Sequence, residues 1–194
     1  MKKYKLPLPD SDISYFPNFL ESEYASAYFK SLKSDVPWRQ DEIKVFGKIY
    51  PQPRLTALYG TNNKSYSYSG IVMKPLPFNE SLKAISKKLS KLTPVEFTSC
   101  LINYYRDGKD SNGWHSDDEK ELGKNPVIAS VSLGQERYFH LRHRKRKELK
   151  HKILLDHGSL LLMSGPTQHF WHHQIPKTAK SIGERINLTF RVIP

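Results

Sequence analysis

The sequence predicts an α+β fold, with a β-rich core and helices packed on its outside. From residue 95 onward, short runs rich in β-branched and aromatic residues follow one another, separated by turn-forming residues. The first half of the chain instead contains two segments in which apolar residues recur at three- and four-residue spacing, which is typical of helices. Strands of this number and spacing are typical of an antiparallel barrel or sandwich.

The first half of the chain predicts two helices and a region of short strands. Residues 1–18 form an extended, proline-punctuated lead-in, and residues 21–35 have helical spacing. Residues 41–78 contain short β-like runs broken by Gly, Pro and Asn. The second helix is expected over residues 79–92, with Asn79 as its N-cap and its leucines on one face.

The second half of the chain predicts a series of strands. They are expected at residues 97–105, 126–134, 138–143, 152–163, 170–175 and 185–193. The sequence contains no internal repeat, low-complexity tract or interdomain linker. We therefore expect residues 1–194 to form a single domain.

The chain is strongly basic, which indicates polyanionic partners. Its 31 Lys and Arg residues outweigh 19 Asp and Glu residues, which gives a formal net charge of +12. The densest basic run, RHRKRKELKHK at residues 142–152, is either a solvated loop or a contact for a phosphate backbone.

The single cysteine, Cys100, limits the kinds of metal site that the chain can hold. It excludes internal disulfides, cysteine-based zinc fingers and cysteine-ligated iron–sulfur clusters. Any metal must therefore be bound mainly by His, Asp and Glu side chains.

Hydropathy gives no indication of a membrane protein. No apolar run approaches the ~18 residues that a transmembrane helix needs. Residues 1–10 include lysines but no apolar stretch of signal-peptide length. We expect a monomer without membrane contact, located in the cytoplasm, or in the nucleus if the source is eukaryotic.

A candidate metal site lies in the segment WHSDDE. His115 and Asp117 are two residues apart, so in an extended segment both side chains point to the same side. Such a pair is common by chance, and a third ligand is expected from FWHHQIP, where His172 and His173 face opposite sides of a later strand. Two histidines and one carboxylate form the facial triad of non-haem Fe(II) oxygenases.

The last predicted strand carries a polar face that suits a dicarboxylate. The residues of this face are Arg185, Asn187, Thr189 and Arg191. Such a strand is often simply half-exposed, but guanidinium groups also bind carboxylates through paired hydrogen bonds. Asn103 and Tyr105 share one face of an earlier strand and offer similar donors. A metal triad together with this cradle suggests a 2-oxoglutarate-dependent oxygenase.

Eight motifs follow one another between roughly residue 40 and the end of the chain. They are PRLTALYG, SYSYSG, NYYRDGKD, WHSDDE, IASVSLG, DHGSLLLM, HHQIPK and RINLTFR. In this order they resemble the AlkB family of Fe(II)/2-oxoglutarate-dependent nucleic-acid dealkylases, close to its duplex-acting and single-strand-acting eukaryotic homologues. The resemblance implies a double-stranded β-helix (jelly-roll) core in residues 95–194, flanking N-terminal helices, and a nucleotide-recognition lid in residues 41–78.

The resemblance also implies the ligands of the metal and of the co-substrate. Iron(II) would be bound by His115, Asp117 and His173, because the family's third ligand directly precedes an x-[LIV]-P segment, here QIP. With O2 as the other co-substrate, 2-oxoglutarate would be held by Asn103, Tyr105, Arg185, Asn187, Thr189 and Arg191. Among these, we expect Arg185 and Tyr105 at the distal carboxylate, with Arg191 and Asn103 near the iron-chelating end.

The activity implied by the resemblance is oxidative demethylation. It repairs N-alkylated bases in DNA, such as 1-methyladenine and 3-methylcytosine, by direct reversal, and it releases formaldehyde, succinate and CO2. The partner is then alkylated DNA, single- or double-stranded. Two alternatives stay open: an RNA demethylase or other 2-oxoglutarate-dependent hydroxylase, and a non-catalytic nucleic-acid-binding module.

Acidic residues beside the metal ligands are expected to contact the substrate. Asp118 and Glu119 match the family's base-reading positions, and their charge suits the cationic ring of a methylated base. The alternative is a solvated acidic turn.

Aromatic and basic residues before position 70 are also assigned to the substrate by resemblance. Tyr68, with Tyr66 and Ser69 beside it, matches the aromatic residue that stacks on a flipped base. Phe46 in VFGK resembles the wedge of the duplex-acting homologue, or else is a core phenylalanine, and Arg54 is expected to face the nucleic acid. Because PRLTALYG, WHSDDE and DHGSLLLM are closer to the single-strand-acting branch, strand preference stays open.

Overall fold

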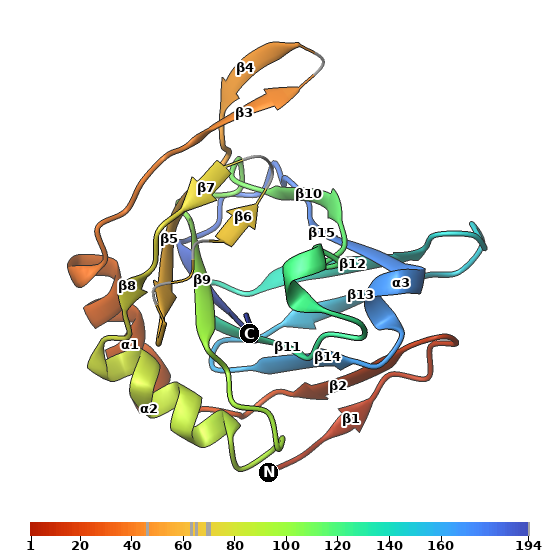
Figure 1. The fold of residues 1–194 in the computed structure, drawn as a ribbon, viewed down its shortest axis with the longest axis horizontal. Helices are drawn as coiled ribbons and strands as arrows, with labels where there is room; N and C mark the ends of the chain where they lie inside the picture. The colour runs from red at the N-terminus through yellow and green to blue at the C-terminus, as the bar shows by residue number, and fades with distance from the viewer. Residues whose placement is uncertain (46, 63, 65, 69–70, 194) are drawn as a thin grey trace.

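The chain folds around two β-sheets (Figure 1). The computed structural model describes residues 1–45, 47–62, 64, 66–68 and 71–193. The larger sheet has eight strands, in the order β1 (Tyr4–Lys5), β2 (Asp12–Phe16), β14 (Leu160–Ser164), β11 (Ile128–Gly134), β16 (Arg185–Arg191), β9 (Ser99–Tyr105), β5 (Leu55–Gly60) and β8 (Leu76–Pro77). Neighbouring strands pair antiparallel, apart from β5 and β8.

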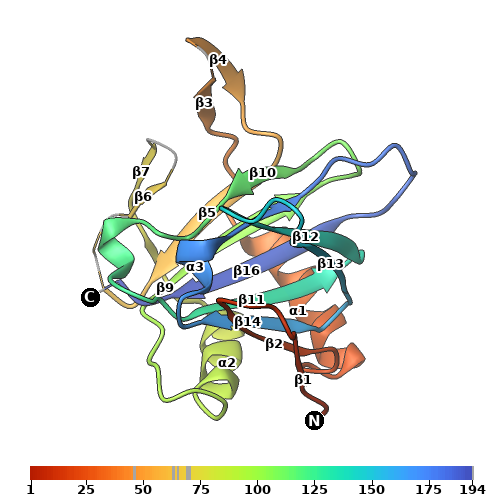
Figure 2. The same ribbon diagram turned by 90° about the vertical axis from the view of Figure 1, so that its right-hand side faces the viewer.

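The smaller sheet has four antiparallel strands and faces the larger one (Figure 2). Its order is β10 (Asn112–His115), β15 (Trp171–Ile175), β12 (Arg137–His143) and β13 (Lys150–Leu155). From β9 to β16 the chain passes back and forth between the two sheets, which is the topology of a jelly roll. The predicted α+β class with a jelly-roll core is confirmed.

Two helices pack on the outer side of the larger sheet (Figure 1). They are α1 (Ser22–Asp35) and α2 (Glu80–Leu89). Asn79 accepts a hydrogen bond from the backbone N–H of Leu82 at 2.9 Å, so the predicted N-cap is confirmed. Leu82, Ile85 and Leu89 are completely buried, and each contributes about 1.5–3 kcal/mol through the removal of apolar surface from water.

Two predicted boundaries are wrong. The second helix ends at Leu89 rather than at residue 92, because the chain turns after Ser90. The run at 152–163 is not one strand but two, β13 and β14, which belong to different sheets. Gly158 separates them with a φ of +76°, and a Cβ there would lie 2.7 Å from the carbonyl oxygen of Leu20.

Strand β16 is buried on both of its faces. Its apolar residues Ile186, Leu188 and Phe190 pack into the core under the two helices. Its polar residues face the space between the sheets and are also buried. The alternating pattern therefore does not mark a half-exposed strand, since its polar face is turned inward.

The remaining described elements are short. Two hairpins, β3 (Glu42–Val45) with β4 (Lys48–Pro51) and β6 (Tyr66–Tyr68) with β7 (Ile71–Met73), lie in the region predicted as a lid, toward the end of the molecule where β10 lies (Figure 1). A 3-10 helix, η1 (Lys120–Leu122), follows β10, and a single turn, α3 (Thr167–Phe170), precedes β15. Among the described residues, no helix has both the length and the apolar character needed to cross a membrane.

Candidate metal centre

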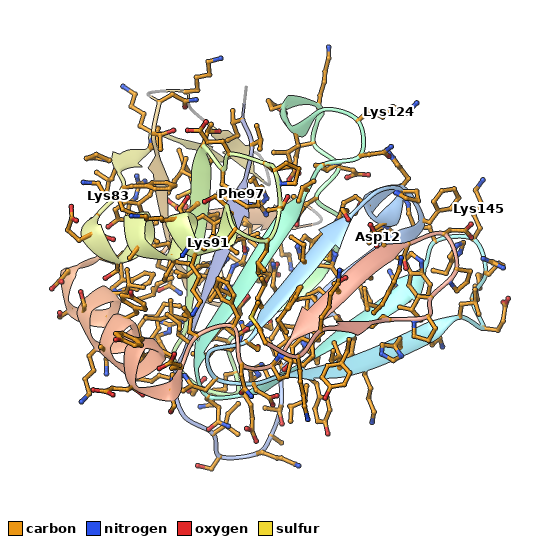
Figure 3. The ribbon with its side chains drawn as sticks, turned by 90° about the horizontal axis from the view of Figure 1, so that it is seen from below. Asp12, Lys83, Lys91, Phe97, Lys124 and Lys145 are labelled. Carbon is orange, nitrogen blue, oxygen red and sulfur yellow. The ribbon has the colours of Figure 1, made fainter. Side chains whose placement is uncertain are left out.

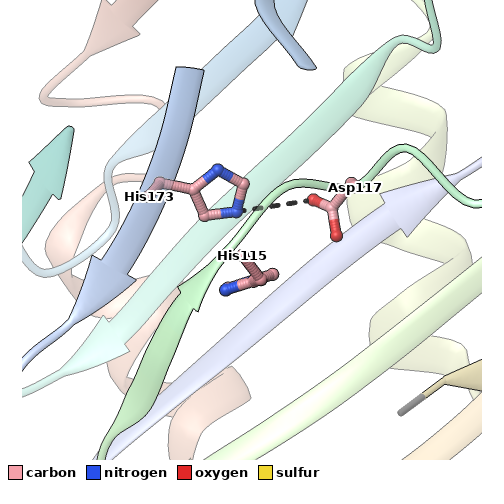
Figure 4. Close-up of side chains that lie close together, drawn as sticks. All are labelled: His115, Asp117 and His173. Carbon is pink, nitrogen blue, oxygen red and sulfur yellow. Dashed lines mark ion pairs between the residues drawn. The ribbon is translucent and has the colours of Figure 1, made fainter. Parts of the chain in front are cut away.

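Three potential metal ligands meet at one end of the smaller sheet (Figure 4). His115 ends β10 and His173 lies on β15, and the antiparallel register places the two residues directly opposite each other. Asp117 follows in the next loop, and one ligand atom from each residue lies within 4.8 Å of the others. The fold thus brings the predicted triad together, with His173 as its third member. His172, the residue before it on β15, points to the opposite side of the sheet.

The imidazole of His115 is oriented by its own strand. Its Nδ1 lies 2.7 Å from the carbonyl oxygen of Gly113. Because a carbonyl can only accept, Nδ1 carries the ring proton and Nε2 presents a lone pair, toward which Asn112 Nδ2 is placed at 3.3 Å. Burial lowers the pKa of His115, although Asp117 opposes this, so the ring is in the neutral form that binds a metal.

The imidazole of His173 lies in a largely apolar setting. It stacks on Phe139 with ring centroids 5.1 Å apart and meets the ring of His115 edge-on at 4.2 Å. Burial lowers its pKa to about 3, and the nearby His115 acts in the same direction. Its Nε2 lies 3.8 Å from Asp117 Oδ2, which is too long for a direct hydrogen bond.

Asp117 is held from two sides. Its backbone N–H donates to Gln168 Oε1 at 2.9 Å, and its Oδ1 accepts from Arg191 Nη2 at 2.5 Å. Burial alone would raise the pKa of this carboxyl, but the positive charge and the hydrogen bond of Arg191 act in the opposite direction, and the pKa is lowered to about 2. The carboxylate is therefore ionised at neutral pH, and one of its oxygens is directed toward the histidines.

These protonation states predict how metal binding responds to pH. Two histidines of ordinary pKa would together release about one proton on binding a metal at pH 6.5. Here the pKa values of His115 and His173 are lowered and Asp117 is already ionised, so we expect the release of clearly less than one proton at that pH. Calorimetric titration with Mn(II) in two buffers of different ionisation enthalpy measures this number. Release of a full proton would show that a ligand histidine is still charged in the metal-free protein.

Gln168 is a positioning residue for the metal site. It is completely buried on α3, and its amide nitrogen faces Met163 Sδ at 3.7 Å, which orients the amide oxygen toward Asp117. Replacing Gln168 by leucine is expected to weaken Mn(II) binding by about 10- to 100-fold, the usual cost of losing a partner behind a metal ligand. Gln40→Leu is the control, since the side chain of Gln40 donates to the carbonyl oxygen of Gln52, away from the three ligands. Equal metal affinities for both variants would refute this role.

A buried cavity between the sheets continues from the three ligands. Its lining includes every residue predicted to hold 2-oxoglutarate: Asn103, Tyr105, Arg185, Asn187, Thr189 and Arg191. These residues come from two neighbouring strands, and the register of β9 and β16 sets Tyr105 opposite Arg185 and Asn103 opposite Asn187. Within the cradle Thr189 donates to Asn187, which in turn donates to Ser130 at 2.8 Å.

Arg185 is the most informative residue of this cavity. Its guanidinium is 1% exposed, lies 5.2 Å from the ring centre of Tyr105, and donates through Nη2 to Ser132 Oγ at 3.0 Å. Its Nε and Nη1 have no hydrogen-bond partner in the part of the chain that the structure describes. Burial lowers its pKa to about 10, which still leaves it cationic. A buried cation with two unmatched donors fits the carboxylate of a ligand such as 2-oxoglutarate.

Arg54, which was predicted to face the nucleic acid, lies largely inside the protein. The residue is only 4% exposed, and its guanidinium donates to Asn103 Oδ1 at 2.8 Å and to the carbonyl of Ser111 at 3.3 Å. That it faces the nucleic acid stays a prediction. Its observed contact is instead with Asn103, one of the cradle residues.

The other predicted substrate residues are placed only in part. Asp118 is exposed and accepts a hydrogen bond from Arg144 at 3.0 Å, while Glu119 is partly buried. The backbone of Tyr66 and Tyr68 forms β6, but their side chains lie outside the described part of the chain. Phe46 and Ser69 lie outside the described residues altogether.

Several residues of the site were missed by the sequence analysis. Ser130 and Ser132 alternate with apolar residues in IASVSLG, which is a signal that they share the inward face of β11. Gln168 gives no such signal, because its contact with Asp117 joins segments 51 residues apart.

Known proteins resemble the chain in sequence and in structure. The profile of the 2OG-Fe(II) oxygenase superfamily matches residues 12–191. The chain is 42% identical over 196 residues to the mouse (Mus musculus) protein "Alpha-ketoglutarate-dependent dioxygenase alkB homolog 3", covering 96% of this chain and 68% of that protein. It is 38% identical over 192 residues to the human (Homo sapiens) "DNA oxidative demethylase ALKBH2", covering 94% and 73%.

The chain thus spans roughly two thirds of the length of these relatives. The solved structure of OsALKBH1 covers 98% of this chain and 99% of its own with a TM-score of 0.68, and its 15% identity makes it a likeness of fold.

Proposed function

The chain belongs to the 2OG-Fe(II) oxygenase superfamily and, within it, to the AlkB family, and from this we propose that it demethylates alkylated bases in DNA by oxidation. In the reaction, a methylated base, 2-oxoglutarate and O2 give the repaired base, formaldehyde, succinate and CO2. The substrates we propose are 1-methyladenine and 3-methylcytosine. The single observation that carries the proposal is the buried, incompletely paired Arg185 in the same cavity as the ligand triad.

The residues of the site fit the two groups that this chemistry requires. Iron(II), when bound by His115, Asp117 and His173, supplies the oxidising chemistry. An ion held by three protein ligands would still be able to bind a chelating co-substrate. The cradle on β9 and β16 lines the same cavity as the three ligands. Arg185 would bind the distal carboxylate of 2-oxoglutarate beside Tyr105, which leaves its keto-acid end directed to the metal.

The chain also fixes the orientation of these groups before any ligand arrives. Arg191 bonds the carboxylate of Asp117, and Gln168 bonds its backbone N–H, so this ligand is held between two elements. Burial between the sheets separates the distal end of the cradle from bulk solvent, since Arg185 is 1% exposed. Such preorganisation keeps an oxidising reaction away from the protein's own surface and from bulk solvent.

Acidic residues next to the triad support a cationic base as the substrate. Asp118 and Glu119 directly follow the ligand Asp117, and both 1-methyladenine and 3-methylcytosine carry positive charge on the ring. In the ligand-free structure Arg144 pairs with Asp118 at 3.0 Å. A cationic base that bonded Asp118 would compete with that arginine.

Formaldehyde release tests the proposal. The purified protein, supplied with Fe(II), 2-oxoglutarate and O2, is given oligonucleotides containing 3-methylcytosine or 1-methyladenine as single-stranded DNA, duplex DNA and RNA. We expect turnover on DNA, with equal amounts of formaldehyde and succinate. Turnover on RNA alone would identify an RNA demethylase. Binding without turnover on single-stranded DNA, duplex DNA or RNA would refute the proposed repair function.

A further inference from the structure

The smaller sheet has an outer face that the metal site does not use. Alternate residues of β12 point into the core, as Phe139 and Leu141 do. The residues between them point outward and form, with their neighbours, the surface that we call the outer face: Trp114, Tyr138, His140, Arg142, Lys150 and Lys152. The register sets His140 beside Lys152 and Arg142 beside Lys150, so three cations from two neighbouring strands lie close together.

Aromatic rings on the outer face are paired with cations. The guanidinium of Arg142 lies 4.2 Å from the ring centre of Trp114, and Lys152 Nζ lies 5.3 Å from that of Tyr138. The ring of Tyr138 is 48% exposed. Exposed aromatic rings beside positive charge are the combination that binds unpaired bases by stacking and their phosphates by charge.

The outer face is hollowed along its length. Three shallow hollows adjoin one another, since the first shares His140 with the second, and the second shares Arg142 and Lys150 with the third. They extend from the loop after β15, where Lys177 and Lys180 lie, to the turn between β12 and β13. Strand β12, which runs along this path, has seven residues and is therefore about 23 Å long, enough for several consecutive nucleotides rather than for a single ion.

Positive charge predominates on the outer face. Along β10, β12, β13 and β15, all of them inside the described part of the chain, no outward position is acidic. Exposed acids lie beside the path: Glu136 lines the first hollow, Glu148 lies in the β12–β13 turn, and Asp118, in the loop after β10, is paired with Arg144. A polyanion therefore meets attraction in the middle of the path, where Arg142, Lys150 and Lys152 lie.

We propose that the outer face binds a single-stranded segment of nucleic acid, separately from the metal cavity. The inference rests on the proposed function for the kind of polymer, and it adds where the strand beside the reacting base lies. Trp114 and His115 are consecutive residues on opposite sides of β10, so the outer face begins one residue away from the metal. A duplex would engage the cations but not the rings, because its bases are stacked on each other. This favours an unpaired strand.

Binding of an unmodified 20-nucleotide single-stranded DNA tests the proposal without any need for turnover. Replacing Lys150 and Lys152 together by glutamine is expected to reduce the slope of log affinity against log salt by about 1.4, which is about 0.7 for each lost phosphate contact. Tyr138→Ala is expected to weaken binding by about 5- to 150-fold for the single strand and not for a duplex of the same sequence. Fluorescence anisotropy over a salt series gives both values.

The matched control replaces Lys87 and Lys91 by glutamine. These exposed lysines belong to α2 and the turn after it, far from the β12–β13 turn where Lys145 lies (Figure 3). The charge change is the same, but the salt slope is expected to stay as in the wild type. Equal slopes for the two double variants, or equal loss of duplex and single-strand binding in Tyr138→Ala, would overturn the proposal. Because the DNA carries no lesion, a failure of the demethylase assay leaves this result unaffected.

Discussion

Replacing Asp117 by alanine is expected to abolish turnover and to weaken metal binding by more than the about 10- to 100-fold that follows loss of a residue behind a ligand. Asp117 is the anionic member of the triad, and its carboxylate is already ionised and directed to the two histidines. Metal affinity is measured by calorimetric titration with Mn(II), and turnover by formaldehyde release.

The same substitution is expected to lower stability, which has to be separated from the loss of metal. Arg191 loses the buried carboxylate with which it pairs, and breaking such a pair costs about 3–5 kcal/mol. Asp117→Asn keeps the volume of the side chain and serves as the gentler variant. His172→Ala is the control, since His172 lies on the same strand as His173 but on its other side. A soluble, folded Asp117→Asn protein with wild-type metal affinity would show that the triad is not the metal site.

Replacing Arg185 by methionine is expected to raise the Kd for 2-oxoglutarate by about 30-fold or more. Truncating one partner of a buried, hydrogen-bonded charge pair costs about 2–5 kcal/mol, and each 1.36 kcal/mol is a factor of ten. The same substitution is not expected to destabilise the ligand-free protein. Because two nitrogens of Arg185 have no partner among the described residues, removing its buried charge is expected to leave the Tm at least as high as in the wild type.

Arg137 provides the matched control for this prediction. It is also a buried arginine near Tyr105, but it donates to the backbone carbonyls of Asp107, Asp110 and Pro176. Arg137→Met should therefore lower the Tm and leave 2-oxoglutarate binding nearly unchanged. Titration of the Mn(II)-loaded variants with 2-oxoglutarate, together with thermal unfolding, compares the two. A lowered Tm and an unchanged Kd for Arg185→Met would assign Arg185 a purely structural role.

The parts of the site that were predictable are those set by local periodicity. A strand turns alternate residues to the same side, so the spacing of His115 and Asp117, and the alternation along β16, were enough to group the right side chains. The fold class followed for the same reason, because strand-like runs dominate the second half of the chain. The family resemblance then selected His173 over His172, and the register of β10 with β15 agrees with that choice.

The parts that were not predictable depend on contacts between distant segments. The sequence of β16 is the same whether its polar face meets solvent or a cavity, and only the second sheet decides between them. An arginine such as Arg54 is usually exposed, but here its hydrogen bond to Asn103 on β9 directs the side chain inward. Gln168 acquires its role from the short turn α3, which carries it to the loop of Asp117. None of these contacts produces a periodic pattern of residues in the sequence from which it could be predicted.

The position of the triad also has a mechanical consequence. His115 and His173 belong to the smaller sheet, whereas Asp117 is bonded to Arg191 of the larger one, so an ion held by all three cross-links the two layers of the barrel. Removing the metal with a chelator would then increase the local motion of the strands around the cavity, in addition to abolishing turnover. Amide hydrogen exchange in β10 and β15 is expected to become faster when the metal is removed, while exchange in α1 and α2, which pack behind the larger sheet, stays slow.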